Sequence, residues 1–403
     1  MRFNLWEDCN RVPLTELLSF IVDNRGKTVP TAPSGHKLIA TNCVTNNTLF
    51  PVYDKIRYLS EETYQTWFRA HPIPGDILFV NKGTPGRVCL VPDPVDFCIA
   101  QDMIALRADE SKIYPKYLFT VLRSREIQQQ IYNTNVGDVI PHFKKQFLDQ
   151  LLIPIPERSI QESIGDLYYV LSLKAERNKK INDNLEQQAQ AIYHERFETV
   201  SPNDLPSDWR IVTLGEVATI SNKSFNPLKE PETLLEHYSI PAFDEARFPV
   251  FELSTSIKSN KFIIDASCFM ISKLNPTTKR VWKPYCLTGN AVCSTEFIVY
   301  KAKDKTITDF LYSVIDSNSF SDFMCSHVTG STGSRQRTTP SDTLSYELIL
   351  PSEDELAEFQ SLVSPMYAQI RINAIENDRL KRLRDSLLPK LMSGEIDVST
   401  IQL

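Results

Sequence analysis

The chain repeats one sequence pattern at an offset of about 194 residues, and a repeat of this length indicates a duplicated domain rather than a solenoid unit. An apolar run with prolines begins near Leu151 and leads into a helical stretch that ends around Phe197. A second such run begins near Leu348 and leads into a helical stretch that ends around Met392. Whatever one half binds, the other half is therefore expected to bind something of the same kind.

Each half is expected to be an α+β domain followed by one long helix. The expected strands cover residues 76–81, 98–107, 267–273 and 293–301, and the expected shorter helices cover residues 115–132 and 307–324. A polar, proline-rich segment at 199–209 reads as a linker between the repeats. We therefore divide the chain into domain 1 (1–157), long helix 1 (158–198), domain 2 (199–351) and long helix 2 (352–403).

The two long helices carry matching seams with an alternating four-three spacing, which is typical of a coiled coil. The seam of the first covers positions 167, 171, 174, 178, 181, 185, 188 and 192, and that of the second lies 195 residues later. Both seams are polar in the middle, with Asn178 and Asn373 at equivalent positions. The sequence predicts that the helices pair as an antiparallel coiled coil with pseudo-two-fold symmetry, in which the asparagines fix the register. The alternative is that each helix packs only on its own domain.

Local signals set the expected limits of these helices. Ser159–Glu162 and Ser352–Glu355 have the spacing of capping boxes, in which each side chain satisfies an orphan backbone amide of the other. Pro365 lies inside the second helix. We expect a short helix and a bend before it, with Ser364 as a new N-cap.

Composition excludes some classes of protein. The net charge of −6 argues mildly against nucleic acid binding, although basic residues cluster locally at 273–283, 335–337 and 379–384. The eight cysteines form no Cys-x-x-Cys pair, so no metal site is expected. The first dozen residues contain charged side chains and no signal-like apolar core, so a cytoplasmic location is expected.

A polar loop in domain 2 is the strongest candidate binding site. It runs from Gly330 to Pro340, after a helix and before the strand expected at 346–350. Glycines allow close approach of a phosphate, while arginine pairs with guanine and glutamine with adenine. The candidate residues are Gly330, Ser331, Thr332, Gly333, Ser334, Arg335, Gln336 and Arg337. The alternative is an ordinary solvated loop.

Domain 1 has a loop at the equivalent point, but with different residues. Its candidate binding residues are Gly137, Asp138, His142, Lys144 and Lys145. Duplicated domains that keep the loop position and change its residues are expected to read two different nucleic acid sequences.

A second pair of loops suits phosphate clamping, because each begins with lysine and ends with arginine. The candidates are Lys82, Gly83, Thr84, Gly86 and Arg87 in domain 1, and Lys273, Thr277, Lys279 and Arg280 in domain 2. Hairpins with exposed charges would look the same.

Catalytic motifs are weak. Asp93, Glu110 and Lys112 formally fit a nuclease pattern with two metal-binding acids and a lysine, but the spacing is loose and domain 2 lacks the acid-x-lysine pair. A metal-dependent endonuclease remains the alternative function. Cleavage assays of variants at these residues would separate it from a binding protein.

The whole chain resembles the DNA-specificity (S) subunit of type I restriction–modification systems. The most specific likeness is Leu387-Leu-Pro-Lys-Leu-Met-Ser-Gly-Glu-Ile396, which resembles the end of that family's second conserved helix. The segment 187–197 resembles the end of its first conserved helix, and Gly330–Pro340 followed by the run up to Pro351 is similar to the end of its target-recognition domains. Residues 137–145 depart from that last pattern.

The resemblance implies two target-recognition domains that each read one part of a bipartite, asymmetric DNA site. It implies that the paired helices set the gap, and that two methyltransferase (M) subunits dock on the chain and bring S-adenosylmethionine. It also implies restriction (R) subunits that use ATP and Mg. The chain itself would bind no cofactor and be non-catalytic.

Overall fold

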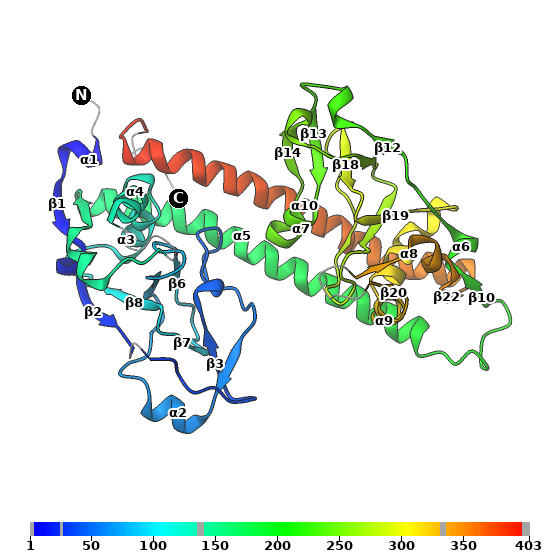
Figure 1. Ribbon diagram of the computed structural model, residues 1–403, viewed down its shortest axis with the longest axis horizontal. Coiled ribbons are helices and arrows are strands. Elements are labelled where there is room, and N and C mark those ends of the chain that lie inside the picture. The colour runs from blue at the N-terminus through cyan, green and yellow to red at the C-terminus, as the bar shows by residue number, and fades with distance from the viewer. Residues whose placement is uncertain (1–3, 25–26, 135–140, 331–335, 397–403) are drawn as a thin grey trace. The chain divides into compact units, whose positions relative to one another are not determined.

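The computed structural model describes residues 4–24, 27–134, 141–330 and 336–396 (Figure 1). The chain forms two compact units. Unit 1 comprises residues 1–177 and 379–403, and unit 2 comprises residues 178–378. Below, domain 1 and domain 2 denote the parts of these units that precede the two long helices.

Domain 1 is built from small sheets and short helices (Figure 1). Its elements are α1 (Leu5–Asp8), β1 (Asn10–Pro13), β2 (Leu18–Val22), β3 (His36–Ile39), β4 (Arg57–Leu59), α2 (Glu61–Thr66), β5 (Ile77–Val80), β6 (Val88–Leu90), β7 (Phe97–Ile99), β8 (Met103–Ala108), α3 (Pro115–Leu122), α4 (Arg125–Thr134) and β9 (Leu152–Ile155). The sheets have the strand orders β2-β8-β5-β6, β4-β3-β7 and β1-β9.

Domain 2 has the corresponding set. Its elements are β10 (Arg210–Thr213), α6 (Leu214–Val217), β11 (Ala218–Ile220), β12 (Ser224–Phe225), β13 (Leu234–Tyr238), α7 (Ile240–Ala246), β14 (Val250–Leu253), β15 (Lys261–Ile263), β16 (Cys268–Ser272), β17 (Val281–Trp282), β18 (Ala291–Ser294), β19 (Phe297–Ala302), α8 (Thr308–Ile315), α9 (Asn318–Ser326), β20 (Val328–Thr329), β21 (Arg337–Thr338) and β22 (Glu347–Leu350). The sheets have the orders β11-β19-β16-β17, β12-β15-β18-β13-β14, β10-β22 and β20-β21.

The strand orders confirm the duplication. β2-β8-β5-β6 has the same connectivity as β11-β19-β16-β17, and β1-β9 has the same as β10-β22. In both domains a parallel strand pair, β3 with β7 and β13 with β18, stands beside an antiparallel edge strand. The expected helix at 115–132 is divided into α3 and α4, and the one at 307–324 into α8 and α9.

The two long helices are α5 (Arg158–Tyr193) and α10 (Glu353–Met392). Each contributes to both units. In unit 1 the last turns of α10 bury Leu388, Leu391 and Met392 in the core that also contains Ile164 and Tyr168 of α5. The core of unit 1 is therefore completed by residues from the far end of the chain.

Within unit 2, α5 and α10 pair through asparagine amides, of which those of Asn178 and Asn373 are buried. The Nδ2 of Asn178 donates to Asn377 at 3.0 Å and to Glu376 at 2.6 Å. The Nδ2 of Asn373 donates to Asn182 at 2.8 Å. Because rising residue numbers on α5 meet falling numbers on α10, the pairing is antiparallel, as expected.

These contacts have a local two-fold relation. The repeat offset takes Asn178 to Asn373 and Asn182 to Asn377, so it converts the pair 178/377 into the pair 373/182. Asn178 and Asn373 are 1% and 3% exposed. The sequence predicted that Asn178 and Asn373 pair with each other. Instead, Asn178 bonds to Asn377 and Asn373 bonds to Asn182, and we call these four residues the asparagine quartet.

The buried face of the helices differs from the expected seam at several positions. Ile181, Leu362 and Leu383 were assigned to the seams but are 45%, 41% and 46% exposed. The adjacent Val363 is buried in the core of its own domain. Both interpretations of the helices therefore hold, because one face packs on a domain while a neighbouring face meets the other helix.

Two local expectations about the helix limits were wrong. Helix α5 begins at Arg158, so Ser159 lies inside the helix rather than capping it, and its carbonyl accepts from the Ser163 hydroxyl at 2.9 Å. Ser352 does cap α10, accepting from the Glu355 N–H at 3.4 Å. Helix α10 continues through Pro365 without a new start. Burial of flanking side chains such as Val363 overrides the local cost of the proline.

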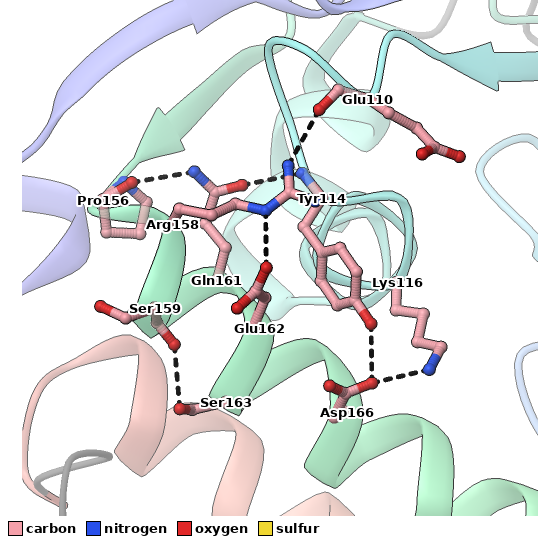
Figure 2. A network of polar contacts seen from close by, with 10 residues as sticks. All are labelled: Glu110, Tyr114, Lys116, Pro156, Arg158, Ser159, Gln161, Glu162, Ser163 and Asp166. Atoms are coloured by element: carbon pink, nitrogen blue, oxygen red, sulfur yellow. Dashed lines mark hydrogen bonds and ion pairs between the residues drawn. The ribbon is translucent and has the colours of Figure 1, made fainter.

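The first turns of α5 lie very close to the N-terminal end of α3 (Figure 2). The Tyr114 N–H donates to Gln161 at 2.9 Å, and the Tyr114 hydroxyl donates to Asp166 at 2.8 Å. A Cβ on Gly165 would lie 2.6 Å from the backbone nitrogen of Tyr117. Only glycine fits at this crossing without a shift of backbone.

We predict that Gly165→Ala destabilises the protein. Overpacking typically costs about 1–3 kcal/mol. This opposes the gain of about 1 kcal/mol from the higher helix propensity of alanine. Guanidinium unfolding of the full chain should show a lower midpoint. The matched control is Gly289→Ala, because nothing lies within 4 Å of a Cβ there. An unchanged or raised midpoint for Gly165→Ala would contradict the close crossing.

Candidate functional site

The two candidate loops of domain 1 lie against one another. Lys82 and His142 form an antiparallel bridge. The Phe143 N–H donates to the Asn81 carbonyl at 2.8 Å, and the Asn81 side chain donates to the Phe143 carbonyl at 3.3 Å. The two loops are about 60 residues apart in the chain, and the hydrogen bonds between their backbones bring them onto one surface.

Domain 2 brings its two loops together in the same way. Leu274 and Arg337 form an antiparallel bridge. The Asn275 N–H donates to the Gln336 carbonyl at 3.0 Å, and the Thr338 N–H donates to the Lys273 carbonyl at 3.1 Å. The bridging residues of the two domains are separated by 192 and 195 positions (274 − 82 and 337 − 142). The duplication therefore reproduces the loop-to-loop contact, not merely the two loops.

The cations of domain 1 are mostly available to a ligand. Lys82 and Lys144 are exposed and Arg87 is half-buried. Among the residues that the structure describes, no acidic side chain pairs with Lys82, Arg87 or Lys144. Lys145 instead pairs with Asp23 at 2.8 Å.

Two cations of the first loop in domain 2 are bound internally. Lys279 pairs with Asp316 at 2.9 Å. Burial raises the pKa of the Asp316 carboxyl, an effect that Lys279 opposes. Arg280 holds both oxygens of Asp244, at 2.6 and 2.9 Å. The half-buried Lys273 makes no ion pair with any residue that the structure describes.

Arg337 is also held within domain 2. Its guanidinium makes two hydrogen bonds to Glu296, each of 3.0 Å. This contact raises the pKa of Arg337 above its already high ordinary value. Glu296 lies between β18 and β19, and its carbonyl accepts the Lys273 N–H at 2.9 Å. Glu296 thus ties the two candidate loops to the sheet, a role that sequence reasoning missed because no local pattern marks it.

The two glycines of the domain 1 loop have different surroundings. Both adopt a positive φ, +84° at Gly83 and +85° at Gly86. A Cβ on Gly83 would meet nothing within 4 Å, so this backbone is open to a ligand. Gly86 is buried, and a Cβ there would lie 3.1 Å from Gln128 and Ile131 of α4. Gly86 therefore serves packing, while the Gln128 side chain holds its carbonyl at 2.9 Å.

The remaining candidates divide as follows. Thr84 is half-buried, whereas Thr277 and Gly330 are exposed, and Gly330 has a φ of +116°. Seven candidates lie outside the described residues, namely Gly137, Asp138, Ser331, Thr332, Gly333, Ser334 and Arg335.

The three residues of the nuclease pattern, Asp93, Glu110 and Lys112, are not gathered around a metal site among the described residues. Lys112 pairs with Asp109 at 3.3 Å and donates to the Glu16 carbonyl at 3.0 Å. The Glu110 carbonyl accepts from Arg158 (Figure 2). Asp93 is exposed. In the described part of the chain, no three histidine, cysteine or acidic side chains gather as a metal site would require. No described helix is both long and apolar enough to span a bilayer.

Comparisons with known proteins agree with the resemblance drawn from the sequence. A family model described as the type I restriction modification DNA specificity domain matches residues 19–187. The MjaIX specificity subunit of Methanocaldococcus jannaschii is 22% identical over 356 residues, covering 81% of this chain and 79% of that protein. The HindI specificity subunit of Haemophilus influenzae is 23% identical, covering 80% and 86%.

The fold is also found in a solved structure. The S subunit of the type I restriction–modification system from M. genitalium superposes with a TM-score of 0.60 and covers 97% of this chain and 98% of that one. Its sequence is 16% identical, so this likeness concerns the fold. It confirms two α/β domains and a pair of long helices.

Proposed function

We propose that the chain is a DNA specificity subunit of a type I restriction–modification system, and that each domain reads one part of a bipartite, asymmetric DNA site. The observation that carries the proposal is the repeated bridge, Lys82 with His142 and Leu274 with Arg337. One frame thus presents two loops of different composition, which suits two half-sites of different sequence. As a specificity subunit, the chain would have no catalytic role of its own.

In domain 1 we assign phosphate contacts to Lys82, Arg87 and Lys144. These cations lack an internal acidic partner among the described residues, so DNA phosphates would not have to displace one. Gly83 allows close approach of the backbone. His142, beside Lys82, would lie at the same surface.

In domain 2 we assign base reading to the loop that contains Gln336. Arg280 and Arg337 hold the loops through Asp244 and Glu296. Each guanidinium has five N–H donors, and a bidentate carboxylate uses two, so donors remain for a phosphate or base. The internal pairs would hold these side chains ready in one orientation.

We further propose that the helix pair sets the gap between half-sites. The chain would dock two methyltransferase (M) subunits, which bring S-adenosylmethionine, and restriction (R) subunits, which use ATP and Mg. It would itself bind no cofactor, and the complex would act in the cytoplasm. The similarity to two curated specificity subunits supports this assembly.

We expect Lys82→Ala and Lys144→Ala to weaken DNA binding about equally on all sequences. Each lost phosphate contact should lower the slope of log K against log salt by about 0.9. Binding of the complex to its DNA site, measured by fluorescence anisotropy across a salt series, provides the test. Lys180→Ala, an exposed lysine of α5, is the matched control. A loss confined to one base position would instead indicate base contacts.

We expect Gln336→Ala to relax one position of one half-site. A bidentate contact to adenine contributes about 1–3 kcal/mol of discrimination. Methylation-aware sequencing of DNA modified by the variant complex would report the relaxed position. The other half-site should keep its sequence, because domain 1 reads it. Gln188→Ala on the exposed face of α5 is the control. An unchanged motif would remove Gln336 from the base-reading surface; its neighbour Arg335 is expected to behave likewise.

We expect the fragment 1–198 to form a homodimer. Its α5 can supply Asn178 and Asn182 to a second copy, which restores the quartet with true two-fold symmetry. With the methyltransferase subunit, the dimer should recognise an inverted repeat of the first half-site.

Light scattering and sequencing of the methylated DNA provide the measurements. The control fragment carries Asn178→Lys, which places a charge at the buried pairing site and should keep the fragment monomeric. If a monomeric fragment still modified the original asymmetric site, domain 2 would not be a reader.

A further inference from the structure

Glu176 of α5 and Arg371 of α10 occupy equivalent positions of the repeat, and each bonds to the backbone of its own domain. In unit 1, Glu176 of α5 accepts the Leu49 N–H at 2.8 Å. Leu49 is buried, and its carbonyl accepts the Leu90 N–H at 2.8 Å in β6. Glu176 is therefore joined to a sheet of domain 1 through a single buried residue.

A buried arginine makes the segment around Leu49 rigid. Arg123, at the end of α3, donates to the carbonyls of Thr45 at 3.2 Å and Val88 at 2.7 Å. It also donates to the Tyr168 hydroxyl of α5 at 3.3 Å. Because this segment is held from several sides, a force on Glu176 is passed to the domain.

In unit 2 the equivalent bond comes from α10. Arg371 donates to the Tyr285 carbonyl through two N–H groups, at 3.2 and 3.4 Å. The Tyr285 hydroxyl donates to the Arg247 carbonyl at 3.1 Å. Arg247 in turn pairs with Glu186 of α5 at 2.6 Å. The segment at Tyr285 is thus attached to both helices of unit 2.

The repeat relates the two helix positions but not their targets. Residues 176 and 371 are 195 apart, the same offset that relates Asn178 to Asn373. Leu49, however, lies between β3 and β4, whereas Tyr285 lies between β17 and β18. The bonds also have opposite polarity, with a carboxylate accepting in one and a guanidinium donating in the other. The two domains are therefore attached to equivalent helix positions through different contacts.

The domains also attach to the helices elsewhere. Domain 1 meets α5 at the Gly165 crossing, and domain 2 meets α10 where Ser313 and Tyr367 bond at 2.7 Å. Domain 1 is also held by Arg123 on Tyr168 of α5, and domain 2 by Arg247 on Glu186 of α5. A longer attached stretch of helix resists a pivot better than a short one. Glu176 lies beyond Tyr168 on α5 and Arg371 lies beyond Tyr367 on α10, so each bond lengthens the attached stretch of its helix.

We propose that Glu176 and Arg371 are positioning residues that fix the angle of each domain on its helix and thereby restrict the gap lengths that the chain accepts. The inference rests on the proposed function. Adding one base pair to the gap moves a half-site by about 3.4 Å along the duplex and turns it by about 35°. A domain that cannot pivot should reject that change, whereas a loosened domain should tolerate it.

The test uses the full chain with its methyltransferase partner. Duplexes carry the native site or the same half-sites with the gap changed by one base pair. For Glu176→Ala and Arg371→Ala, we expect the preference for the native gap to fall about two- to tenfold, the factor that one hydrogen bond contributes. The half-site sequences should stay the same.

Conservative variants provide the controls. Glu176→Gln keeps the acceptor oxygen and Arg371→Lys keeps a donor, so both should retain most of the gap preference. Arg379→Ala removes an exposed cation of α10 and should change nothing.

A uniform loss of binding at every gap length would reduce these residues to a stabilising role and overturn the proposal, as would unchanged preferences. If the native complex itself showed no gap preference, the proposed function would fail instead. The two failures are therefore distinguishable.

Discussion

The asparagine quartet, with Asn178 and Asn373 buried, constrains the register of α5 and α10 in unit 2. Asn178, Asn182, Asn373 and Asn377 satisfy one another only at one alignment of the helices. A shift by one turn would leave the buried amides of Asn178 and Asn373 without these partners, at about 1–3 kcal/mol for each group. Apolar seams alone would tolerate such slippage, because Leu and Ile side chains accept many neighbours. The register of the two helices in unit 2 therefore depends on these polar side chains rather than on the apolar seams.

Much of the architecture could be predicted from the sequence, because each half of a duplicated chain provides an independent check on the pattern in the other half. The repeated strand patterns, both long helices and the equivalence of Asn178 with Asn373 were all visible. The partners of Arg280 and Arg337 were not, because Asp244 and Glu296 are 36 and 41 residues away and no local spacing connects them. The start of α5 was misplaced, since Ser159 has the residue type of a cap but not its position.

The two domains differ in whether the candidate DNA-binding cations also hold the loops in place. In domain 1 the candidate cations Lys82 and Lys144 are exposed and without internal acidic partners among the described residues, while Gln128 and Arg123 hold the neighbouring backbone. In domain 2 the cations themselves hold the loops. Duplicated frames can therefore diverge not only in which residues contact a ligand but also in which residues keep the loops rigid.

The discontinuity of unit 1 determines the order in which the chain can be completed during synthesis. A ribosome makes all of residues 178–378 before it makes Leu388, Leu391 and Met392, which belong to the core of unit 1. The nascent first domain must therefore wait with Ile164 and Tyr168 incompletely covered until the final helix turns emerge. Translation that stops just after residue 378 would supply all of unit 2 but leave the core of unit 1 open, and cellular proteases act on such exposed apolar surface.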